Sequence, residues 1–301
     1  MAPVTARAAP APGAWGGIAI MVATTVLFAV QDAVSRHLAG EYNTFMVVMV
    51  RYWFLAAFVL AVARRSGGLR AAARTRRPWL QAARGALLIA DICLLVQAFT
   101  LLGLVESHAL FAVYPLLVAA LSGPVLGERV GPWRLGAIAA GLVGVGIMLR
   151  PGSAVLSPVA ALPLAAALCF AAYSVLTRLA AREDAPATSL LWMGLVGAAL
   201  TTALGLPAWE PLRPEDWGWM ALLCVLGVSG HGLLIVAYDR AEASALQPFT
   251  YLQAVWAGAL GILLFGEALA PPVALGAAVV IAAGLVALLR ERRAARRAPR
   301  P

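Results

Sequence analysis

Long apolar runs alternate with short polar, proline-rich or glycine-rich breaks along most of this chain. A helix that crosses the hydrocarbon core of a bilayer needs about 20 mostly apolar residues. The runs therefore predict an all-α membrane protein with ten transmembrane helices. Their approximate spans are 15–38, 44–63, 79–101, 105–125, 132–150, 158–180, 188–207, 217–238, 245–265 and 272–290.

The second half of the chain is a weak copy of the first. Residues 98–132 align without gaps onto residues 237–271. Matching positions are about 140 residues apart along the whole chain, and two related hydrophobic halves are typical of secondary transporters, whose substrate site lies between the repeats. The domains expected are a disordered cytoplasmic tail at 1–14, a five-helix repeat at 15–150, a second at 158–290 and a basic cytoplasmic tail at 291–301.

The composition strengthens the membrane assignment. The chain is 62% hydrophobic and 12% charged, whereas an average soluble protein has about 25% charged residues. The net charge of +9 comes from arginines clustered in short flanks. Such clusters indicate topology and lipid contact, because nucleic-acid binding would need a basic face on a soluble module. The three cysteines lie inside apolar runs without a CxxC motif, so no metal, cofactor or disulfide framework is expected.

The distribution of arginines predicts the orientation. Six arginines lie between residues 64 and 77, and six more lie between residues 290 and 300. Cytoplasmic segments are enriched in basic residues, so both segments, and with them both termini, are expected in the cytoplasm. Each repeat holds five helices, an odd number, so the second must enter the membrane from the opposite side. The pattern thus predicts two inverted repeats around a central cavity.

Several motifs recur in register in the two halves. Pro124 to Glu128, followed by Leu135-Gly136, has its partner in Gly266-Glu267, followed by Leu275-Gly276. This pattern resembles the drug/metabolite transporter superfamily, in particular its ten-helix EamA-type members. The resemblance implies a basket of helices in the bacterial inner membrane that works by alternating access on a small molecule. Known members move amino acids, nucleobase-like compounds, and cofactors such as riboflavin or S-adenosylmethionine.

Three function hypotheses follow. We expect export of a small organic metabolite such as an amino acid, because export is common in the resembled family. The alternative is uptake of a cofactor such as riboflavin or S-adenosylmethionine. A remote alternative is an intramembrane serine protease, because Gly227-Val228-Ser229-Gly230 contains a GxSG motif. That chemistry needs a histidine on a later helix, and none follows His231; we therefore expect no enzyme activity.

Charged residues inside the predicted helices are candidates for function, because charges are costly in hydrocarbon. Asp32 and Arg51 lie at similar expected depths, so they could pair, line an outer vestibule or hold a zwitterionic substrate. Asp32 could instead pair with Arg36 one turn away. Asp91 lies near the middle of helix three and has only leucines as helical neighbours. It could bind a proton or a cationic group, or be hydrogen-bonded by a neighbouring helix.

Polar and aromatic residues on the other helices complete the candidate set. Such side chains suit an organic substrate with hydrogen-bonding edges, although interhelical hydrogen bonding is the alternative for each. Two prolines are expected to loosen helices four and nine for gating, and Glu128 and Glu267 are expected to cap the helices that follow them. The substrate or coupling candidates are Asp32, Arg51, Asp91, Gln97, His108, Tyr114, His231, Gln247, Tyr251, Gln253 and Trp256, and the gating candidates are Pro115 and Pro248.

Helices five and ten are rich in small residues, which allow close approach of helices in lipid. Gly136, Gly144, Gly276 and Gly284 are the clearest examples. They could pack these helices within one monomer or form a homodimer interface. No residue in these helices is expected to contact the substrate.

Overall fold

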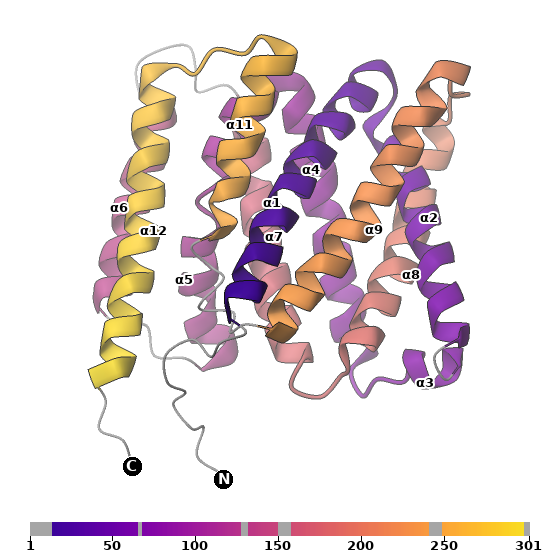
Figure 1. Ribbon diagram of the computed structural model, residues 1–301, viewed down its shortest axis with the longest axis horizontal. Helices are drawn as coiled ribbons and strands as arrows, with labels where there is room; N and C mark the ends of the chain where they lie inside the picture. The colour runs from indigo at the N-terminus through magenta and orange to yellow at the C-terminus, as the bar shows by residue number, and fades with distance from the viewer. Residues whose placement is uncertain (1–13, 66–67, 128–131, 150–157, 241–248, 298–301) are drawn as a thin grey trace.

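The computed structural model describes residues 14–65, 68–127, 132–149, 158–240 and 249–297. These residues are nearly all helical (Figure 1). The helices are α1 (Ala14–Glu41), α2 (Thr44–Arg65), α3 (Leu69–Ala73), α4 (Pro78–Phe111), α5 (Tyr114–Leu126), α6 (Pro132–Leu149), α7 (Ala161–Ala180), α8 (Pro186–Gly205), α9 (Trp217–Arg240), α11 (Leu252–Phe265) and α12 (Pro271–Arg297). Short 3-10 turns lie at Pro158–Ala160, Leu206–Ala208 and Pro214–Asp216.

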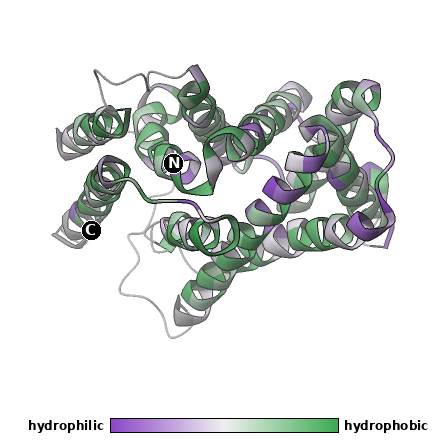
Figure 2. Cartoon of the chain, turned by 90° about the horizontal axis from the view of Figure 1, so that it is seen from above, coloured by the Kyte–Doolittle hydropathy of each residue, from purple (hydrophilic) through white to green (hydrophobic). Residues whose placement is uncertain are grey.

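The length and composition of these helices suit a membrane. Within the described residues, six helices are long and apolar enough to cross one, and four further apolar helices are shorter. Most of the helical ribbon carries the colour of hydrophobic residues in Figure 2. Large apolar side chains such as Trp79, Leu263 and Val143 are more than half exposed, as expected where lipid rather than water covers a surface.

Helices from different halves of the chain lie side by side. α1 packs against α9, and α4 packs against α7. α2 packs against α8, and α6 against α12. Each half therefore buries its apolar faces mainly on the other half, which places the centre of the molecule between the two repeats.

The third and fourth predicted helices differ from their expected form. They are joined in α4, which bends at Gly103, where φ is +85°. The fourth helix is then interrupted at Ala112 and Val113, and α5 begins at Tyr114. Pro115 follows directly, and a proline has no N–H to donate to the preceding turn. The expectation of one continuous helix at 105–125 is therefore wrong.

The bend at Gly103 is held by a carboxylate from the other repeat. Glu267 lies in the turn between α11 and α12, and it accepts hydrogen bonds from the backbone N–H groups of Leu104 (2.9 Å) and Val105 (2.7 Å). Arg36 of α1 forms an ion pair with the same carboxylate. A side chain at position 103 would collide with Glu267. Glu267 is thus a helix cap, but of the second half of α4; the expectation that it caps the following helix is wrong.

Glycines bring α6 and α12 into contact within the chain. A Cβ atom added at Gly144 would lie 2.8 Å from the carbonyl oxygen of Gly276, and one added at Gly276 would collide with the carbonyl of Gly144. Gly284 instead faces the hydroxyl of Tyr251, whereas Gly136 has no neighbour within 4 Å of such a Cβ among the described atoms. Packing within the monomer therefore uses three of these four glycines.

Candidate substrate site

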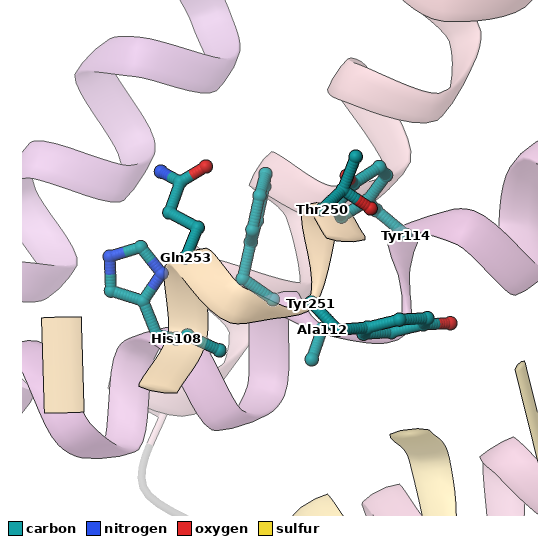
Figure 3. A pocket seen from close by; sticks show the side chains of 8 residues that line it. His108, Ala112, Tyr114, Thr250, Tyr251 and Gln253 are labelled. Carbon is teal, nitrogen blue, oxygen red and sulfur yellow. The ribbon is translucent and has the colours of Figure 1, made fainter. Parts of the chain in front are cut away.

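A small pocket lies where two helices are interrupted. His108, Phe111, Ala112 and Tyr114 come from the junction of α4 and α5, and Thr250, Tyr251, Gln253 and Ala254 come from the start of α11 (Figure 3). A water-sized sphere finds only about 20 Å³ of room in it, far below the roughly 300–1,000 Å³ that is usual for ligand pockets. An organic molecule therefore needs a rearrangement of these helices to enter.

The lining residues of the two sides are counterparts in the repeats. In the gap-free alignment of the halves, Phe111 falls on Thr250, Ala112 on Tyr251, and Tyr114 on Gln253. The pocket thus lies between equivalent breaks, but none of these pairs keeps the same side chain. The backbone of the site therefore follows the symmetry of the repeats, whereas its side chains differ between the two halves.

Both interrupted helices begin at this pocket. Val113 caps the N-terminus of α5, and Tyr251 caps that of α11. A helix N-terminus presents backbone N–H groups and a partial positive charge. Such ends of broken helices contact the substrate in several transporter folds. The pocket can therefore receive electronegative atoms from either side.

Aromatic rings form a continuous wall beside the pocket. The ring centroid of Tyr114 lies 5.1 Å from that of Phe111 and 4.9 Å from that of Phe170. Phe170 in turn lies 5.7 Å from Tyr173. Rings at these separations present both faces and edges to a neighbour. This wall suits a flat aromatic group.

Polar groups meet on the other side. The Gln253 Nε2 amide donates a hydrogen bond to Asp32 Oδ2 at 2.9 Å. His108 Nε2 lies 3.2 Å from the same oxygen. Figure 3 shows the His108 and Gln253 side chains next to each other, from α4 and α11. Asp32 therefore joins α1 to the pocket, and the expected pairing of Asp32 with Arg51 or Arg36 is wrong.

Arg51 and Asp91 lie near this network without a direct bond to it. Both side chains are buried, and Asp91 lies within electrostatic range of Asp32 and Arg51. Arg51 lies against the backbone of α9, where a Cβ added at Gly227 would be 3.2 Å from its Nε. Asp91 Oδ1 is buried without a hydrogen-bond partner among the described residues. A buried polar atom of this kind requires an explanation.

The other predicted residues lie elsewhere. Gln97 accepts a hydrogen bond from Thr44 at 3.1 Å, near the ends of α1 and α2 and away from the pocket. His231 Nδ1 lies 2.8 Å from the Gly227 carbonyl, and its ring meets Phe28 edge-on. Trp256 Nε1 is buried with no partner in the described part of the chain. Three positions lie outside the described residues: Glu128, Gln247 and Pro248.

Apart from Tyr114, the residues of the aromatic wall were not predicted from the sequence. Phe170 and Tyr173 are one helical turn apart on α7, a spacing that usually indicates ordinary packing. Thr250 was missed as well, because nothing in its neighbourhood distinguishes it. The available signal was the repeat: Phe170 is the counterpart of Phe28, which contacts His231.

Within the described residues, no group of three or more His, Cys, Asp and Glu could hold a metal ion. His231 lies within hydrogen-bond distance of its own helix, and its ring packs edge-on against Phe28. Nothing in this geometry activates Ser229 as a nucleophile.

Comparison with known proteins identifies the family. The model of the EamA-like transporter family matches residues 15–150 and again residues 158–289, so the chain belongs to this family. It is therefore a multi-pass membrane transporter of the drug/metabolite superfamily and not an enzyme.

Curated relatives cover nearly the whole chain. A riboflavin transporter of Rhizobium johnstonii is 29% identical over 92% of this chain and 92% of its own length. An S-adenosylmethionine uptake transporter of Rickettsia prowazekii is 24% identical over 92% and 94%. A riboflavin transporter of Vibrio cholerae is 26% identical over 87% and 89%. A solved crystal structure shares the fold, with a TM-score of 0.63, 19% identity and coverage of 95% of this chain and 99% of the other.

Proposed function

We propose that this member of the EamA-like family takes up riboflavin, or a closely related neutral heteroaromatic compound, by alternating access. Two relatives that are named riboflavin transporters align over almost the whole chain. The observation that carries the proposal is the combination of an aromatic wall with amide, imidazole and hydroxyl groups at one pocket. Export of an amino acid, the first expectation from the sequence, is the competing hypothesis.

The chemistry of the pocket fits a flavin. The isoalloxazine ring is flat and neutral, with carbonyl and N–H groups on one edge. Stacking of the ring on Tyr114 and Phe111 would use the aromatic wall, at about 0.5–1.5 kcal/mol for each ring pair. Gln253 and Tyr251 offer hydrogen bonds to the polar edge. An amino acid would leave most of the aromatic wall without a partner.

S-adenosylmethionine is the second candidate, because other relatives carry that name. It bears a sulfonium and an ammonium group, which favour a nearby carboxylate. Asp91 is the carboxylate that could serve, since its Oδ1 is buried without a partner in the described chain. If the substrate is neutral, the same residue is free to bind a coupling proton.

The arrangement of the helices supports an inverted pair of five-helix repeats. α1 runs from the lower to the upper face of Figure 1, and α7, the first helix of the second repeat, runs in the opposite direction. The arginine-rich segments lie at the lower face, where α3 lies and α12 ends. The proposed topology has ten spans, with the lower face and both termini in the cytoplasm of the cell. The proposed repeat boundaries are 15–150 and 158–290.

Transport by the purified full chain in proteoliposomes tests the substrate. Riboflavin, S-adenosylmethionine and leucine are offered at equal concentration, and initial rates are measured with and without a pH gradient. We expect saturable riboflavin entry that leucine does not compete with. Flux of leucine alone would support the competing hypothesis, and flux of S-adenosylmethionine alone the second candidate.

Two substitutions at the wall make this test specific. Tyr114→Leu removes the ring and should raise the KM for riboflavin about tenfold, the effect of about 1.4 kcal/mol of stacking and packing. Tyr114→Phe keeps the ring and should leave the KM within about twofold. Equal KM values for the two variants would exclude stacking on this ring.

Cysteine labelling tests the orientation. Cysteines at the exposed positions Arg76 and Glu215, with Cys169 replaced by alanine, are treated with an impermeant thiol reagent on whole cells. Position 215 should react and position 76 should not. Reaction at 76 from outside would reverse the proposed topology.

A further inference from the structure

Polar side chains tie the two repeats together at both faces of the molecule. The upper cluster comprises Glu41, Tyr42, Arg213 and Asp216, where α1 ends and α9 begins. The lower cluster comprises Thr75, Arg77, Glu183 and Asp184, where α7 ends and α4 begins. The two clusters lie at opposite ends of α8, whose bounds are Pro186–Gly205.

In the upper cluster a hydroxyl group connects the repeats. Tyr42 Oη donates to Asp216 Oδ2 at 2.6 Å and accepts from the backbone N–H of Arg213 at 2.9 Å. The Arg213 guanidinium adds bonds of 2.9 Å to Asp216 and to Glu41. Asp216 is 4% exposed, so its bond with Tyr42 is shielded from water.

In the lower cluster a threonine hydroxyl group connects the two repeats. Thr75 Oγ1 donates to Asp184 Oδ2 at 2.7 Å and accepts from the backbone N–H of Arg77 at 3.1 Å. The Arg77 guanidinium lies 2.6 Å from the Glu183 carboxylate. Gln81, which is fully buried, also donates to Asp184 at 2.7 Å.

The clusters occupy equivalent places in the repeats. Arg77 directly precedes α4 and Asp216 directly precedes α9, the third helices of their repeats. Glu41 and Glu183 have the same spacing as Arg36 and Arg178. Each cluster thus joins the loop after the first helix of one repeat to the turn before the third helix of the other. In the upper cluster the hydroxyl follows the first helix of one repeat and the carboxylate precedes the third helix of the other. In the lower cluster these two positions are reversed.

We propose that the two clusters are alternating locks, of which one opens in each half of the transport cycle. Both are closed here, and the pocket leaves only about 20 Å³ of room for a water-sized sphere. Water can replace hydrogen bonds of this kind at modest net cost, so either lock can open reversibly. Because the locks are equivalent by repeat, opening one while the other stays closed exchanges the conformations of the two halves.

The hydroxyl–carboxylate bonds, buried in the upper cluster and partly buried in the lower one, are the decisive part of each lock. The outer ion pairs are half exposed, with 51% and 49% of the Arg213 and Glu41 side chains accessible, and exposed pairs contribute little. A hydrogen bond to a shielded carboxylate is stronger. Deleting the hydroxyl is therefore the smallest change that should weaken one lock and spare the other.

The test uses matched variants, Tyr42→Phe for the upper lock and Thr75→Val for the lower. Spin labels on cysteines at Gly40 and Gly218 report the upper face, and labels at Arg76 and Ala181 report the lower face, after replacement of the native cysteines by alanine. A Cβ at Gly40 or Gly218 meets nothing within 4 Å. Distances are measured by electron paramagnetic resonance on the full chain in lipid nanodiscs.

We expect Tyr42→Phe to enlarge a long-distance population at the upper face only, by about fivefold, and Thr75→Val to do so at the lower face only; fivefold corresponds to about 1 kcal/mol for one bond. Glu215→Gln, which replaces an exposed carboxylate 3.7 Å from Arg213 at the rim of the upper cluster, should change neither distance. Shifts at both faces, or at neither, in correctly folded variants would overturn the proposal. If Thr75→Val does not fold, Thr75→Ala removes the same hydroxyl.

The inference rests on alternating access but not on the substrate. If the protein does not transport riboflavin but each variant shifts the distance at its own face only, the proposed substrate is rejected and the proposed locks are supported. Riboflavin transport without such shifts would reject the locks and keep the substrate.

Discussion

The contact between α6 and α12 differs at its two ends, although the glycines of both helices correspond by repeat. Near one end, Gly144 meets Gly276 backbone to backbone. The repeat-related contact would join Gly284 to Gly136, but Gly284 faces the Tyr251 hydroxyl and Gly136 faces open space. Equivalent residues thus have different neighbours.

A single divergent position explains the difference. The counterpart of Tyr251 in the first repeat is Ala112, whose methyl group is too short to reach α6. Gly144 is therefore available to α12, whereas Gly284 is occupied by the tyrosine. One end of the helix pair provides packing, and the other end positions a ring of the pocket. The two repeats thus share a backbone arrangement, and a difference in side-chain size at one position gives equivalent glycines different roles.

The largest effect is expected at the tight end of the pair. Gly276→Leu places a side chain against the Gly144 carbonyl and Met148, and backbone cannot move aside as a flexible side chain can. The expected loss is about 1–3 kcal/mol or more, measured as a fall in the melting temperature of the purified protein.

Gly136→Leu is the matched control, because the same glycine of the first repeat has open space around it. It should change the melting temperature little. Equal losses in the two variants would mean that the contact is not asymmetric, or that position 136 is covered by a second copy of the chain.

An intermediate effect is expected at the other end. Gly284→Ala places a methyl group where the Tyr251 hydroxyl lies, so the ring should be displaced and the substrate affinity should fall about tenfold, as about 1.4 kcal/mol would give. Binding of riboflavin to the purified variant, followed by quenching of flavin fluorescence, measures the change.

Tyr251→Phe in the same chain is the rescue, since it removes the colliding oxygen and keeps the ring. The double variant should bind more tightly than Gly284→Ala alone, because residues in contact give non-additive effects. A double variant weaker than both single variants would contradict the proposed collision.

A smaller and more selective effect is expected where the repeats differ in charge. Asp32→Ser gives α1 the residue that the second repeat has at Ser174. Gln253 then loses its acceptor, and His108 loses the carboxylate that lies 3.2 Å from its Nε2. We expect a severalfold loss of transport rate, because one hydrogen bond to a charged group contributes about 1.5–3 kcal/mol and serine replaces part of it.

Ser174→Ala is the control for that substitution. In the described part of the chain the Ser174 hydroxyl donates to the carbonyl of Phe170 in its own helix, at 2.7 Å, so transport should be unchanged. If Asp32→Ser transports at the wild-type rate, the Asp32 network is structural and the pocket does not depend on it.

Sequence reasoning located much of the pocket and few of its contacts. His108, Tyr114, Tyr251 and Gln253 were recognised because polar and aromatic groups are rare in apolar helices, and all four line the pocket. The pairing of Asp32 with Arg51 was wrong, because equal depth on neighbouring helices does not determine which faces meet. A carboxylate is bound by whichever donors tertiary packing brings to it.

Glu267 illustrates the same limit. The sequence showed a glutamate at a turn, where capping of the next helix is the ordinary role. Only the folded chain shows that its oxygens reach the N–H groups of Leu104 and Val105. Those groups are free because Gly103 bends α4. An isolated glycine in an apolar run is not enough to predict such a bend.

The sequence by itself determined the helical character of the chain, its duplication and its family. The bilayer imposes the length of the apolar runs, and an internal repeat can be recognised from the order of the residues alone. The tertiary structure decided where helices break, which carboxylate meets which donor, and which glycines touch. These depend on distances across helices from different repeats, and a spacing along one helix carries no information about the face that another helix presents.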